Sequence, residues 1–172
     1  MTRSALFCAV ALCLSSPALA ASDTNTTSAA ATQHAVPADQ FVQMAAVSNM
    51  FEIQSSMVAK SMAKNADVKA FADQMIADHT KAGEEMKSVA PSTPPDTLDD
   101  KHQAMVDELN KAQGADFDKK YVDMQVQAHK EAVALFSGYA QNGDDADLKA
   151  FAAKTLPVLQ QHYDHVQKLA KM

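Results

Sequence analysis

The sequence predicts an all-α fold, a four-helix bundle of two duplicated helical hairpins with a long crossover that carries a short fifth helix. Apolar residues recur at helical spacing from Asp39 to the end of the chain. Only four glycines are present, and strand signals are few. Two segments that lie 80 residues apart also match each other in sequence. Periodicity, composition and this internal match together favour a helical domain.

The first hairpin is predicted to consist of helices at 39–63 and 66–89, and Pro91 lies just beyond its end. After its first residue, the first of these helices carries only two charged side chains, Glu52 and Lys60. A helix so poor in charge is usually covered by other elements on several sides. We therefore expect Glu52 to be buried, where a carboxylate needs a partner.

The second hairpin is predicted to consist of helices at 115–142 and 146–171, and Gly143 ends the first of them. Between the hairpins lie a proline-rich stretch and a short polar helix at 98–112. A helix of about 15 residues covers about 22 Å, so this connection can travel the length of the bundle. Pro157 interrupts the last helix, which either bends there or starts afresh with Thr155 as its cap.

The internal match indicates that the two hairpins are copies of one unit. Residues 66–72 (ADVKAFA) align with 146–152 (ADLKAFA), and 41–44 (FVQM) align with 121–124 (YVDM). Both pairs of segments have the same offset, which is what a duplication produces. The alternative is a coincidence between two helices that are rich in alanine and lysine.

Four polar side chains fall near the middle of the four long helices, on faces that are otherwise apolar. They are Glu52, His79, His129 and His162. Each histidine has apolar neighbours three and four residues away, as expected for the core of a bundle. Counting from each hairpin turn puts Glu52 level with His79, and His129 level with His162. The two pairs differ in height along the bundle by about one helical turn. We therefore expect all four groups to lie close together, whether the two hairpin turns lie at the same end of the bundle or at opposite ends.

Such a polar layer is either a metal site or a hydrogen-bonded plug that only fixes the helix register. Imidazole and carboxylate ligands suit a divalent zinc, copper or iron ion, and Asp78, Gln125 and Tyr121 are placed to orient such ligands. A buried Glu–His network without metal would instead serve the packing. The chain lacks the Glu-x-x-His motifs of di-iron oxidases, so an enzyme of that class is not expected.

The first twenty residues have the basic start, apolar run and small-x-small end of a secretory signal. We expect a flexible linker at 21–37 and the bundle domain at 38–172. Both cysteines lie within the predicted signal, so the mature chain would hold no thiol ligand. It would carry 14 basic and 21 acidic residues, a balance that argues against nucleic acid as a partner. No later segment is apolar enough to span a membrane.

Four hallmark strings carry a family resemblance that covers about 39–169. They are Ala-Asp-His (77–79), Phe-Asp-x-x-Tyr (117–121), His129 and Leu-Pro-x-Leu-x-x-His (156–162). The chain resembles a bacterial family of exported ferritin-like domains of unknown function, whose members are often labelled predicted outer-membrane proteins. The resemblance implies a ferritin-like four-helix fold in the bacterial envelope, but it supplies no activity and no metal.

The leading hypothesis is a periplasmic bundle that binds a metal ion or small ligand at its central Glu/His layer, with a role in envelope stress or metal handling. The alternative is a non-catalytic interaction module of the envelope, which binds another protein or a second copy of itself. In that case the polar layer would only fix the helix register. A redox enzyme using the same centre is a weaker hypothesis, because no substrate-pocket motif accompanies the histidines.

Overall fold

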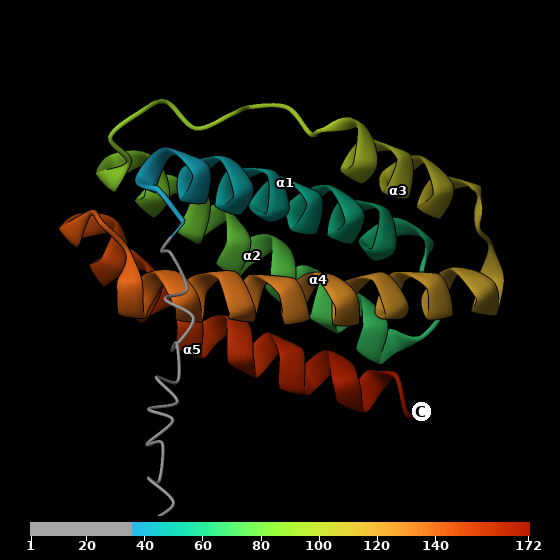
Figure 1. Cartoon of the computed structure of the whole chain (residues 1–172). Helices are drawn as coiled ribbons and strands as arrows, with labels where there is room; N and C mark the ends of the chain where they lie inside the picture. Colours follow the sequence, from blue (N-terminus) through green and yellow to red (C-terminus); the bar gives the residue numbers. More distant parts are fainter. Residues whose placement is uncertain (1–35) are drawn as a thin grey trace, which may run out of the picture. The chain divides into compact units, whose positions relative to one another are not determined.

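The computed structural model describes residues 36–172, which form five α-helices and no strand (Figure 1). Each predicted helix is present, with bounds that differ from the prediction by two residues at most. The predicted signal peptide and nearly all of the predicted linker lie outside the described residues. The helices are α1 (Ala38–Met62), α2 (Ala66–Val89), α3 (Asp100–Lys111), α4 (Gly114–Asn142) and α5 (Ala146–Leu169).

The hairpins α1–α2 and α4–α5 have their turns at opposite ends of the bundle (Figure 1). The crossover leaves the end of α2, runs back along the bundle and brings α3 against α1 before α4 begins. Helix α1 therefore contacts α2, α3 and α4, which explains why it carries so few charges. Among the described residues, no helix combines the length and apolar character needed to cross a membrane.

Polar side chains fix where several helices begin. Asn65, Asp99 and Asp145 cap the starts of α2, α3 and α5 through side-chain oxygens that accept backbone N–H bonds. The carboxylate of Asp118 on α4 accepts from the backbone N–H groups of Lys64 (3.0 Å) and Asn65 (2.8 Å). This contact joins the turn of the first hairpin to the start of the second.

Two apolar clusters form the core, and a layer of buried polar groups separates them. One cluster surrounds Phe41 and Phe136, and the other surrounds Phe71 and Phe117. On each long helix, the buried polar positions lie between the positions that supply the two clusters. The buried polar residues are Glu52, Ser55, Ser56, His79, Gln125, His129 and His162.

Helix α5 continues without a break through Pro157, which is exposed. Of the two alternatives for this proline, a fresh start at Thr155 is therefore wrong, because the helix runs as one element from Ala146 to Leu169. An exposed proline loses one helical hydrogen bond, but water can solvate the carbonyl group that is left free. The core face of α5 is consequently maintained on both sides of the proline.

Candidate metal centre

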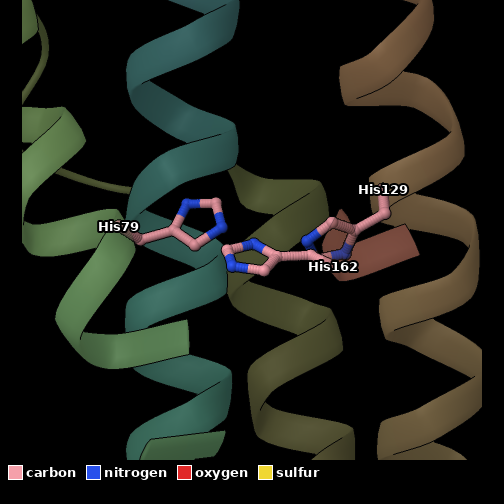
Figure 2. Close-up of side chains that lie close together, drawn as sticks. All are labelled: His79, His129 and His162. Carbon is pink, nitrogen blue, oxygen red and sulfur yellow. The ribbon is translucent and has the colours of Figure 1, made fainter. Parts of the chain in front are cut away.

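The structure brings His79 of α2, His129 of α4 and His162 of α5 together in the polar layer (Figure 2). Their exposed fractions are 6%, 0% and 1%. The ring centroids of these three side chains are 5.5 to 5.8 Å apart. One ring nitrogen from each lies within 4.8 Å of one from each of the others. Three helices from the two hairpins thus supply one imidazole each to the same buried layer.

One nitrogen of each imidazole is held by an oxygen of a neighbouring residue. Because each of these oxygens is a hydrogen-bond acceptor, the ring nitrogen bonded to it donates, and the other nitrogen carries a lone pair. The bonds run from His79 Nδ1 to Asn49 Oδ1 (3.0 Å), from His129 Nδ1 to the carbonyl oxygen of Gln125 (2.9 Å), and from His162 Nε2 to Asp78 Oδ2 (2.9 Å).

The second nitrogen of each ring is buried and has no hydrogen-bond partner. These atoms are Nε2 of His79, Nε2 of His129 and Nδ1 of His162. Leaving a buried acceptor unpaired costs about 1–3 kcal/mol. Three such atoms in one layer are therefore a substantial destabilisation that a binding partner would relieve.

Burial holds all three imidazoles in the neutral form. It lowers the pKa of His79 well below the usual range, and repulsion from the other two rings lowers it further. It lowers the pKa of His129 to about 4, although the bond to the Gln125 carbonyl opposes the shift. It also lowers the pKa of His162, against the opposing effect of Asp78. Neutral imidazole is the form that binds metal ions.

Glu52 of α1 is buried in the same layer, as expected, with an exposed fraction of 1%. Its Oε1 lies 3.7 Å from Nδ1 of His129, the nitrogen that already donates to Gln125. Neither carboxyl oxygen has a hydrogen-bond partner. Burial raises the pKa of Glu52 to about 8, with an opposing effect from the Gln125 amide, so the carboxyl group is protonated at neutral pH. Glu52 thus lies next to the bonded nitrogen of His129 and not next to the unpaired one.

The residues that contact His79 and His162 differ from those predicted by counting residues from the hairpin turns. Asn49, one turn before Glu52 on α1, binds His79, and no sequence signal distinguished it from other polar positions of that helix. Asp78 was predicted to support the site, and it does contact a site histidine. Its partner is His162 of α5, because consecutive residues of a helix point in different directions and cannot serve one ligand together.

The predicted supporting residues on α4 have separate roles. Gln125 supplies its backbone carbonyl to His129, while its side-chain amide donates to Ser55 (3.0 Å). The hydroxyl of Tyr121 pairs with that of Ser56 at 2.8 Å. No hydrogen bond joins Tyr121 to a histidine of the centre in the described part of the chain, so this tyrosine fixes α1 against α4.

Residues 23–169 match the model of a protein family described as a domain of unknown function, DUF4142. The chain belongs to this family. The resemblance seen in the hallmark strings is thereby confirmed, because the match includes all of them. The DUF4142 description states no activity.

Two solved structures are similar to this DUF4142 chain. A crystal structure of a DUF305 fragment from Deinococcus radiodurans has a TM-score of 0.66 at 14% identity and covers 80% of this chain and 99% of its own. CopM in the Cu(II)-bound form has a TM-score of 0.65 at 16% identity, with coverages of 79% and 97%. No curated protein matches the sequence. These likenesses show a shared helical-bundle fold.

Proposed function

We propose that this protein binds one transition-metal ion through His79, His129 and His162. The proposal rests on the unpaired nitrogens of the three buried, neutral imidazoles, which we call the inner nitrogens. The hydrogen-bonded nitrogen of each ring is its outer nitrogen. Each ring is oriented by a hydrogen bond at its outer nitrogen, an arrangement that recurs in histidine ligands of metal sites. The centre therefore has both the ligands and the groups that hold them in place.

The hydrogen-bonding pattern favours a metal ion over a polar plug. In a plug, one imidazole N–H would donate to the lone pair of the next ring, so that buried groups satisfy each other. Here all three ring donors are directed to Asn49, Gln125 and Asp78, outside the cluster. No ring donor is left for the inner nitrogens, whereas a cation would bind all three lone pairs together.

Three imidazoles are suitable ligands for a divalent zinc, copper or iron ion. An ion bound at about 2.0–2.1 Å in a tetrahedral site requires its ligand nitrogens to lie about 3.4 Å apart. The nitrogens lie within 4.8 Å of one another, so ring movements of about 1 Å would close the site. CopM, which has the same fold, was solved with Cu(II) bound, and copper is therefore the first ion to test.

Glu52 was predicted from the sequence as a fourth ligand, but it is not a metal ligand in this proposal. Its carboxyl group reaches the centre only at the outer nitrogen of His129. We propose that it supports His129 and does not contact the ion.

The secretory signal predicted at the N-terminus supports a location in the periplasm, where such a site would serve metal handling or the response to envelope stress.

Elemental analysis of the protein purified from the periplasm tests the proposal. We expect about one bound ion per chain in the wild type and almost none in His129→Ala/His162→Ala, which removes two of three ligands. The matched control is His102→Ala/His165→Ala, which removes two histidines outside the centre and should retain the ion. Equal metal contents in all three proteins, whether high or near zero, would reject the proposal. A melting temperature that does not respond to added metal would favour the interaction module.

A further inference from the structure

We infer that the three-histidine centre leaves one coordination position open, and that this position takes a small monodentate ligand from an adjoining cavity. This inference rests on the proposed metal binding. Structural zinc sites are closed by four protein ligands, whereas sites with three protein ligands keep a position for water or a substrate. The question is whether the protein itself supplies a fourth ligand.

The oxygens nearest the histidines are already used or point elsewhere. Oδ1 of Asn49 and Oδ2 of Asp78 accept the ring N–H groups of His79 and His162. Oε1 of Glu52 lies 3.7 Å from Nδ1 of His129, the nitrogen that already donates to the Gln125 carbonyl. Among the described residues, no carboxylate joins the three histidines in the group that could hold an ion. The fourth coordination position of the ion is therefore left for a ligand that the protein does not supply.

A cavity of about 30 Å³ adjoins His79 and His162. A water molecule needs at least about 10–15 Å³ of such volume, so the cavity holds a ligand of about one to three heavy atoms. Its walls are mainly apolar and include Ala82 of α2, Ala132 and Phe136 of α4, and Leu159 of α5. A ligand there would be held by the ion more than by hydrogen bonds, which fits water, a diatomic molecule or a small anion.

The same cavity reaches side chains that contact solvent. Asp78, with its side chain 39% exposed, and Val158, at 38%, are both part of the wall. Thr155 and Val158 lie beside Pro157, so the part of α5 that contains the proline borders the space. A molecule of this size therefore has a short path from the surface to the ion.

Azide binding to the Cu(II)-loaded protein tests the open position. We expect azide to produce an azide-to-copper charge-transfer band and to change the copper electron paramagnetic resonance spectrum. Ala82→Leu fills the cavity from α2, so it should retain copper and weaken azide binding at least tenfold. Ala77→Leu is the matched control, because Ala77 is exposed on the same helix and lines no part of the cavity. It should bind azide like the wild type.

Ala132→Val fills the cavity from α4 and provides a second test if Ala82→Leu disturbs folding, which circular dichroism would reveal. Failure of the wild type to bind Cu(II), zinc or iron would overturn the proposed function and this inference with it. Histidine-bound copper that shows no response to azide would overturn only the open position. Equal azide affinity in the wild type and in both filled variants would place the ligand outside this cavity, which would also overturn the inference.

Discussion

At the scale of single residues, the orientation of three imidazole rings determines what the polar layer can bind. Each ring donates outward and directs its lone pair inward, because an oxygen of Asn49, Gln125 or Asp78 accepts from the outer nitrogen. Burial keeps the rings neutral by lowering each pKa. A fixed tautomer and a neutral ring are the two properties that a ligand histidine requires.

Glu52 and the histidines give the metal-free protein opposite dependences on pH. The pKa of Glu52 is raised from 4.5 to about 8, so its contribution to stability is present below pH 4.5 and is lost as the pH rises through 8. The pKa of His129 is lowered from 6.5 to about 4, so its contribution is present above pH 6.5 and is lost as the pH falls towards 4. Removing the carboxylic acid alone separates the two effects.

We predict that Glu52→Gln makes the metal-free protein more stable than the wild type in alkaline solution. Glutamine stays neutral, whereas the wild type loses up to about 5 kcal/mol between pH 4.5 and 8. The difference in free energy of unfolding should be small at pH 4.5, grow with pH and become constant above about pH 8. Urea unfolding at several pH values measures it. A difference that does not change with pH would show that Glu52 ionises normally.

At the scale of helices, periodicity predicted the elements well because each helix has a continuous apolar face. The core-facing positions of His79, His129 and His162 followed from spacings of three and four residues. Contacts between helices were harder to predict, because a shift of one helix along its axis by one turn replaces one contacting residue by another. Asn49 therefore faces His79 where Glu52 was expected.

The bond between Asp78 of α2 and His162 of α5 links two helices and orients one proposed ligand. We predict that Asp78→Ala lowers the metal affinity by about 10–100-fold, as loss of such a supporting group usually does. Asp73→Ala is the control, because Asp73 lies on the same helix and forms only an exposed ion pair with Lys60. Titration against a competing chelator measures both affinities. Equal affinities for the two variants would show that Asp78 does not position His162.

At the scale of the whole molecule, the two hairpins and the crossover place the polar layer at the centre of the bundle. The apolar clusters around Phe41 and Phe71 lie on either side of this layer and supply the stability that the unpaired polar groups reduce. The sequence predicted this architecture because the hairpins are regular and similar. It could not predict the ring orientations, since these depend on partners supplied by other helices.

The most direct test of the proposed metal centre is a crystal structure of the protein grown with Cu(II) or Zn(II), with anomalous diffraction data at the absorption edge of the metal. We predict one strong anomalous peak at about 2.0–2.1 Å from Nε2 of His79, Nε2 of His129 and Nδ1 of His162. A polar layer without an anomalous peak, or a peak bound only by surface residues, would contradict the proposal.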